Sequence, residues 1–214
     1  MEYCHCGSVG AYLRSGNRLK EEELREVVSC CLLGLSYLHN KNVIHRVPIH
    51  GIVNIQDIKP DNLFISENGV IKMGDFGLAV QLEHSCSKRN TVCGTSLYMG
   101  PEVYCDGAVL KSDVWSLGMS VIEMAEGKHP LASCTSFQVM KKVCDGEPPS
   151  LSSSEWSSDL VEFVKRCLVK DVNRRSSVEE LLRVSVSSVS LDVASFRARR
   201  RGANRERRQL LFVV

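Results

Sequence analysis

The sequence predicts a protein that is mainly α-helical with small β-hairpins. Several long stretches repeat apolar residues at helical spacing, whereas only short β-prone runs flank an Asn-Gly pair. The chain has 214 residues, of which 43% are hydrophobic and 24% are charged, which is ordinary for a soluble protein with one sizeable core. We therefore expect one folded domain.

The first expected helix lies in residues 21–40. It has an acidic first turn, Glu21-Glu22-Glu23, which is typical of helix starts. The pattern predicts an end near His39-Asn40 and places Cys30-Cys31 in the core. The apolar residues at helical spacing are Leu24, Val27, Val28, Cys31, Leu35 and Leu38.

A β-hairpin is expected next along the chain. The β-prone runs 63–65 and 70–73 are joined by Ser66-Glu67-Asn68-Gly69, whose Asn-Gly pair is typical of a tight turn. Such a hairpin would bring Asn62 and Asp75, which stand at its two ends, close together.

Three further helices complete the predicted elements. Ser112-Asp113 can cap a helix that contains the apolar residues from Trp115 to Met124. Apolar spacing also predicts helices within 156–168 and within 177–182.

Four polar residues around the hairpin carry the functional signal. Asp57 lies two residues before Lys59 and five before Asn62, and Asp75 follows the second strand. Phosphoryl transfer needs such a set, because a hydroxyl must be oriented, charge neutralised and Mg²⁺ held by oxygen ligands. Each residue alone is more simply explained as a solvated loop charge, but the ordered combination favours phosphoryl transfer.

In order and spacing these residues resemble the catalytic and magnesium-binding loops of eukaryotic protein kinases, H-R-D-x-K-x-x-N followed by D-F-G. The resemblance covers residues 1 to about 182. It continues through Gly94-Thr95, Met99-Gly100-Pro101-Glu102 in place of A-P-E, Asp113-Val114-Trp115-Ser116-Leu117-Gly118, and Arg175.

Four shorter stretches of the sequence resemble one branch of the protein kinases in particular, the sterile-twenty group, and especially its Hippo and germinal-centre kinases. The stretches that carry this likeness are 1–9, 87–92, 122–128 and 163–170. The resemblance implies a serine/threonine protein kinase in a signalling cascade. Lys59, and Thr95 in the segment that would face the substrate, also suit transfer to Ser or Thr better than to Tyr.

The resemblance implies a role for each residue of the catalytic region. Asp57 would orient the substrate hydroxyl, and Lys59 would stabilise the transferred phosphate. Asn62 and Asp75 would bind Mg²⁺. The expected cofactors are therefore ATP and Mg²⁺, and the expected partners are proteins that present Ser or Thr.

The resemblance begins at what would be the hinge between two kinase lobes. Glu2 and Cys4 would stand in this hinge and offer backbone contacts to the adenine of ATP. We expect residues 1–182 to form the large C-terminal lobe, with the N-terminal lobe missing together with its Gly-rich loop and phosphate-binding lysine.

The activation segment would run from Asp75 to Glu102. Thr91 matches the family's phosphorylation site best, and Arg46 would pair with the added phosphate, while an unmodified loop is the alternative. Glu102 and Arg175 would pair and lock the end of the segment onto the domain. The same resemblance implies a structural role for Asp113.

Two segments depart from the family's pattern. Residues 47–56 separate His45-Arg46 from Asp57, and this insertion either bulges out or displaces the catalytic carboxylate. Residues 183–214 hold eight arginines and two acids, a net charge of +6, and are expected to be a disordered tail. Nucleic-acid binding by this tail is less favoured, because no aromatic residues interleave with the arginines.

Cysteine usage and hydropathy predict a cytoplasmic protein. The ten cysteines are scattered, with no signal peptide and no apolar run long enough to span a membrane. Cys4-His5-Cys6 is a weak zinc candidate, because no second pair follows at ligand spacing. One other function stays open, namely a catalytically inactive kinase or pseudokinase fragment that acts as a binding module.

Overall fold

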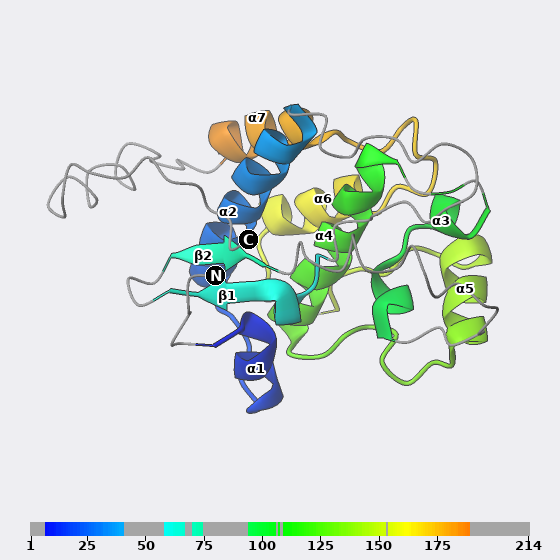
Figure 1. Cartoon of the computed structure of the whole chain (residues 1–214), viewed down its shortest axis with the longest axis horizontal. Coiled ribbons are helices and arrows are strands. Elements are labelled where there is room, and N and C mark those ends of the chain that lie inside the picture. The colour runs from blue at the N-terminus through cyan, green and yellow to red at the C-terminus, as the bar shows by residue number, and fades with distance from the viewer. Residues whose placement is uncertain are drawn as a thin grey trace, which may run out of the picture.

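A computed structural model describes residues 7–40, 58–66, 70–74, 94–105, 107, 109–152 and 154–188. It is mainly helical with one two-stranded sheet, as the sequence predicts (Figure 1). Helix α4 (Leu110–Glu126) lies at the centre and packs against α2 (Glu21–Asn40) and α6 (Ser158–Cys167). No helix in this described part of the chain is long and apolar enough to cross a bilayer.

Helix α2 confirms the expected helix over residues 21–40. Its apolar stripe is buried, and Leu24, Leu32 and Leu35 are completely inaccessible to solvent. Cys30 and Cys31 are core residues, also as expected. Each buried leucine contributes roughly 1.5–3 kcal/mol by leaving water, so this face fixes α2 on the core.

The predicted hairpin is present. Strands β1 (Leu63–Ile65) and β2 (Ile71–Met73) are antiparallel, and Leu63 lies opposite Met73. Leu63 and Met73 are buried, so one face of the hairpin joins the core. The Ser66 hydroxyl accepts a hydrogen bond from the Val70 amide (3.0 Å), which ties the two strands where the connecting turn begins.

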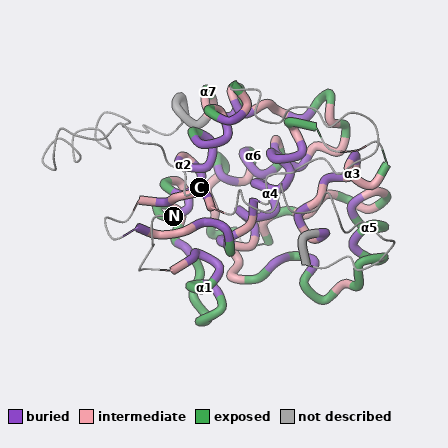
Figure 2. The backbone as a smooth tube through the Cα atoms, viewed as in Figure 1, coloured by how far each residue is buried: buried purple, intermediate pink, exposed green. Residues whose placement is uncertain are grey.

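Helix α4 is buried on nearly every side, as the purple tube in Figure 2 shows. Its buried polar side chains, which include Ser112, Asp113, Ser116 and Ser120, have hydrogen-bond partners, so the helix can lie in the core. The expected start at Ser112-Asp113 is wrong, because α4 begins at Leu110, with Val109 in an extended conformation before it. Ser112 still acts at this end, since its hydroxyl accepts the Val109 amide proton from inside the first turn (3.0 Å).

The two last expected helices differ from prediction at their ends. Trp156 precedes α6, which starts after Ser157 because the Ser157 hydroxyl accepts the Leu160 amide proton (3.2 Å). Helix α7 (Val178–Ser188) continues past the expected end at Leu182. Neither glycine nor proline follows Leu182 until Gly202, so nothing in the local sequence stops the helix there.

Short helices escaped the sequence prediction. The clearest missed signal is in α5, where Thr135 and Gln138 form a reciprocal capping box at the helix start. The helices that the sequence analysis did not predict are α1 (Val9–Arg14), α3 (Pro101–Cys105), α5 (Ser136–Asp145) and the 3-10 helices η1 (Pro60–Asn62) and η3 (Gly94–Tyr98).

Candidate active site

The segment from Ile58 to Asn62 is anchored to the central helix. The Ile58 side chain is buried, and the Ile58 carbonyl accepts a hydrogen bond from the Ser120 hydroxyl of α4 (2.9 Å). Lys59 follows in an extended conformation, and its carbonyl accepts the Asn62 amide proton across η1 (2.9 Å). The backbones of Lys59 and Asn62 are thereby fixed within one turn.

The hairpin places the residue before Asp75 next to Asn62. The Gly74 amide donates to the Asn62 carbonyl (2.8 Å), which continues the strand pairing beyond Leu63 and Met73. Asp75 itself lies outside the described residues. The backbone at Gly74 is nevertheless positioned as the predicted closeness of Asn62 and Asp75 requires.

Helix α1 closes the other side of this turn. A Cβ atom on Gly10 would stand only 2.8 Å from the Asp61 backbone nitrogen, so α1 and η1 touch through their backbones. The Arg14 guanidinium forms an ion pair with the Asp61 carboxylate. Both side chains are about half exposed, so solvent screens this ion pair strongly. The pair links Asp61 in η1 to α1.

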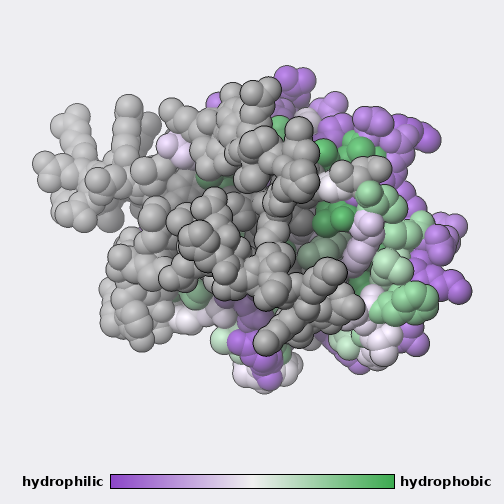
Figure 3. Space-filling model, turned by 45° about the vertical axis from the view of Figure 1, so that its right-hand side comes forward, coloured by the Kyte–Doolittle hydropathy of each residue, from purple (hydrophilic) through white to green (hydrophobic). Residues whose placement is uncertain are grey.

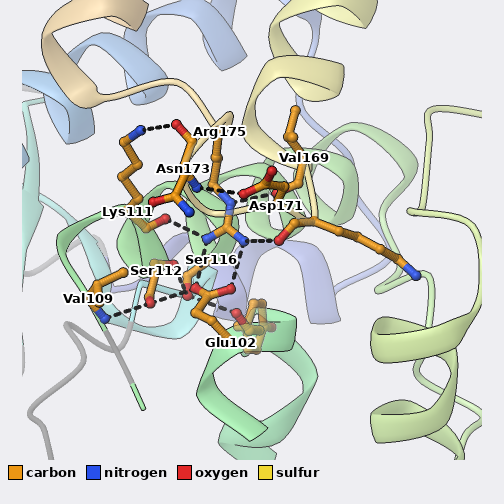
Figure 4. Close-up of polar contacts among 11 residues, drawn as sticks. Glu102, Val109, Lys111, Ser112, Ser116, Val169, Asp171, Asn173 and Arg175 are labelled. Carbon is orange, nitrogen blue, oxygen red and sulfur yellow. Dashed lines mark hydrogen bonds and ion pairs between the residues drawn. The ribbon is translucent and has the colours of Figure 1, made fainter. Parts of the chain in front are cut away.

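A buried ion pair joins α3 to the loop before α7. Arg175 donates through Nη1 to Glu102 Oε1 (2.8 Å) and through Nη2 to Glu102 Oε2 (2.7 Å) (Figure 4). The guanidinium also donates to the Val169 and Lys111 carbonyls, both at 2.8 Å. It lies 5.1 Å from the ring centre of Trp115, within reach of a cation–π contact.

The Glu102 carboxylate is kept ionised in this pair. Burial alone would raise its pKa, but hydrogen bonds from Arg175 and from the Ser112 hydroxyl outweigh burial and lower the pKa. Gly100 leaves the space that this carboxylate needs, because a Cβ there would lie 2.7 Å from both Glu102 oxygens. Gly100, where the resemblance implies alanine, therefore gives this carboxylate room.

Asp113 anchors the start of α4 to the end of α2. Its carboxylate lies 2.9 Å from His39 Nε2, and both side chains are buried. A buried carboxylate needs such partners. The contact holds the last turn of α2 in register with α4.

A second cluster, which sequence reasoning missed, supports η3. The Ser116 hydroxyl donates to the Tyr98 carbonyl (2.8 Å), and the Tyr98 hydroxyl donates to the Glu123 carboxylate (2.5 Å). The His129 ring meets the Tyr98 ring edge-on, with centres 4.9 Å apart. Burial raises the pKa of Glu123, with Asp61 adding to the effect against the Tyr98 hydrogen bond. Serines at 112, 116 and 120, one helical turn apart, were the available signal.

The structure therefore brings together part of the predicted site. Lys59 and Asn62 share one turn, and Glu102 pairs with Arg175 while Asp113 meets His39. Thr95 lies in η3, but its side chain is not described. Outside the described residues are Glu2, Cys4, Arg46, the insertion 47–56, Asp57, Asp75 and Thr91.

The residue types predicted for Mg²⁺ suit this ion, because an asparagine amide oxygen and an aspartate carboxylate are hard oxygen ligands. Asn62 is buried at the base of the hairpin, where its carbonyl accepts the Gly74 amide proton. Among the residues that the structure describes, no group of three or more His, Cys, Asp or Glu side chains could hold a metal.

A lysine–asparagine turn fixed to a central helix and a buried Glu–Arg pair are features that the resemblance to protein kinases predicts. A comparison with known families tests the family itself. The family model described as "Protein kinase domain" matches residues 1–186. The chain belongs to the protein kinase family.

Proposed function

We propose that this protein kinase transfers the γ-phosphate of ATP to serine and threonine hydroxyls of other proteins. The observation that carries the proposal is the anchored turn from Ile58 to Asn62. Ser120 fixes its beginning and Gly74 fixes its end. Catalytic side chains must be held to about half an ångström, and a turn tied at both ends to the core is suited to that demand.

Each residue of this region takes one role in the proposed reaction. Asp57 accepts the proton of the substrate hydroxyl and orients that oxygen for attack. Lys59 places its ammonium charge beside the transferred phosphoryl group. Asn62 and Asp75 supply oxygen ligands to Mg²⁺, which when bound neutralises charge on the ATP phosphates. Backbone groups of Glu2 and Cys4 contact the adenine.

The finer assignments follow from the residues that resemble the sterile-twenty group. Lys59 and Thr95 favour serine and threonine over tyrosine as acceptors. Phosphorylation of Thr91, paired with Arg46, would regulate the activation segment. We assign residues 1–182 to the large lobe, place the protein in the cytoplasm, and treat residues 47–56 as an insertion beside the catalytic Asp57.

Phosphate transfer by the purified full chain tests the proposal. Radiolabelled ATP, Mg²⁺ and casein as a Ser/Thr-rich acceptor are incubated with the chain, and the labelled amino acids are identified after hydrolysis. We expect phosphoserine and phosphothreonine, and a loss of roughly 100-fold or more with Asp57→Asn, because a general base contributes about that much. Asp159→Asn, an exposed carboxylate on α6, is the matched control and should retain full activity.

A nucleotide titration separates this proposal from the binding-module alternative. The same preparation is titrated with ATP in the presence and absence of Mg²⁺, and binding is followed by calorimetry. Saturable Mg²⁺-dependent binding that Asn62→Ala weakens supports the catalytic assignment. A folded chain that neither binds ATP nor transfers phosphate would overturn it and favour a catalytically inactive kinase.

A further inference from the structure

Two cysteines stand where α3 packs against α5. The helices lie beside each other in Figure 1, and the packing is direct. Cys105 is the last residue of α3 and is exposed to solvent, while Cys144 lies in the last turn of α5 and is half-buried. The side of the molecule that carries these helices faces the viewer in Figure 3, where apolar surface is open to solvent.

The two thiols are near enough to influence each other electrostatically. Burial, and then the nearby Cys105 thiol, raise the pKa of Cys144. Burial, and then the nearby Cys144, raise the pKa of Tyr104 to about 12. The Tyr104 hydroxyl donates to the Ser96 carbonyl (2.9 Å), and Lys170 Nζ donates to the Cys144 carbonyl (2.8 Å). Both cysteines are therefore flanked by residues with fixed partners.

We propose that Cys105 and Cys144 form a reversible disulfide that ties α3 to α5 when a peroxide oxidises the protein. A disulfide requires two Cα atoms within about 7 Å of each other, and the two cysteines belong to helices that pack directly on one another. In the structure both cysteines are free thiols, so it shows the reduced state. The inference does not depend on phosphate transfer.

The oxidation balances with hydrogen peroxide as the only oxidant. The exposed Cys105 sulfur, as thiolate, attacks one peroxide oxygen and becomes a sulfenic acid while the other oxygen leaves as water after taking up a proton. The Cys144 sulfur then attacks the Cys105 sulfur, an S–S bond forms, and the S–O bond breaks. The departing hydroxide takes the Cys144 proton and leaves as a second water. Two thiols are thus oxidised by two electrons.

The bond would act on the helix that carries Glu102. Helix α3 has only five residues, and the Glu102–Arg175 pair anchors its beginning. Gly107, with a left-handed φ of 99°, turns the chain just after Cys105, and its amide donates to the Glu102 carbonyl (3.0 Å). A disulfide at Cys105 would add a covalent anchor at the other end, so that oxidation would hold the end of the activation segment against α5.

Peptide mapping of the full chain tests the proposal. The reduced protein is treated with hydrogen peroxide, its remaining thiols are alkylated, and it is digested with trypsin and glutamyl endopeptidase. From the sequence, Cys105 falls in peptide 103–111 and Cys144 in peptide 143–155, because the Glu147–Pro148 bond resists cleavage, while Cys93 stays in 90–102. We expect a linked 103–111/143–155 species, lighter than the two peptides by two hydrogens, that dithiothreitol separates.

Matched variants identify the partners. Cys105→Ser and Cys144→Ser should each abolish the linked species, whereas Cys134→Ser, in the loop before α5, should leave it unchanged. Peroxide should also raise the melting temperature of the unmodified chain and not that of Cys105→Ser. Recovery of peptides 103–111 and 143–155 from the unmodified chain only as separate species, whether alkylated or oxidised, would overturn the proposal without any need for a variant to fold.

Discussion

Arg175 and Glu102, which are 73 residues apart in sequence, meet as a buried bidentate pair with N–O distances of 2.8 and 2.7 Å. The Arg175 side chain is fully buried, and that of Glu102 is 6% exposed. Removing one partner would leave the other charge buried and unpaired, which costs far more than losing a surface ion pair. The pair therefore determines how firmly α3 is attached to the domain.

The first prediction concerns Arg175→Ala. We expect the free energy of unfolding to fall by about 3–5 kcal/mol, because Glu102 would lose its counter-charge in a buried site. Chemical denaturation measures the change. Arg166→Ala is the control, since Arg166 forms only an exposed pair with Glu162 on α6 and should change stability by no more than about 0.5 kcal/mol. Equal effects of the two substitutions would contradict a structural role for the buried pair.

Part of the fold and of the candidate site could be predicted from the sequence, and part could not. The hairpin and helix α2 could be predicted because an Asn-Gly turn and an apolar stripe act locally. The pairing of Glu102 with Arg175 came only from the family resemblance, since no local rule joins residues so far apart. The cluster of Tyr98, Glu123 and His129 forms through tertiary packing. The serine spacing in α4 indicates a polar face on that helix, but it does not indicate which residues meet that face.

The second prediction tests how the turn from Ile58 to Asn62 is attached to α4. In Ser120→Ala, the Ile58 carbonyl would lose the hydroxyl that donates to it from α4, at a cost of about 1 kcal/mol. Hydrogen exchange at the Asn62 amide, which bonds to the Lys59 carbonyl, should become faster. Ser29→Ala is matched, because the Ser29 hydroxyl bonds only to the Arg25 carbonyl within α2. Unchanged exchange at Asn62 would show that Ser120 does not hold the turn.

The third prediction follows from the buried His129 beside η3. Burial lowers the pKa of His129 from 6.5 to about 4, although the Leu97 backbone acts in the opposite direction. The unfolded chain therefore binds a proton at His129 at a higher pH than the folded chain does. Stability from this residue is complete above about pH 6.5 and is lost as the pH falls toward 4.

His129→Asn isolates this effect. An asparagine can still accept the Leu131 amide proton that His129 Nδ1 now accepts (3.1 Å), but it does not titrate. The variant should be less stable at neutral pH, because it loses the ring contact with Tyr98. The difference from the unmodified chain should shrink between pH 6.5 and 4, which urea unfolding at several pH values measures. A constant difference would mean that His129 is protonated equally in both states.

The last prediction concerns Gly10→Ala, where helix propensity and packing act on stability in opposite directions. Propensity alone favours Gly10→Ala by up to about 1 kcal/mol, because alanine loses less backbone entropy in a helix. Packing opposes it, since the new Cβ would stand 2.8 Å from the Asp61 backbone nitrogen as well as against the Asp61 carboxyl group. Forcing atoms into such a contact costs about 1–3 kcal/mol, so we expect net destabilisation, measured by urea unfolding.

Asp61→Ala added to Gly10→Ala separates the two parts of this contact. The double variant removes the Asp61 carboxyl group but keeps the backbone nitrogen, so stability should recover only in part. Ala11→Ser, on the exposed side of the same helix, should change stability by no more than about 0.5 kcal/mol. Stabilisation by Gly10→Ala alone would show that α1 does not lie against the turn from Ile58 to Asn62, and that Lys59 and Asn62 lack this support.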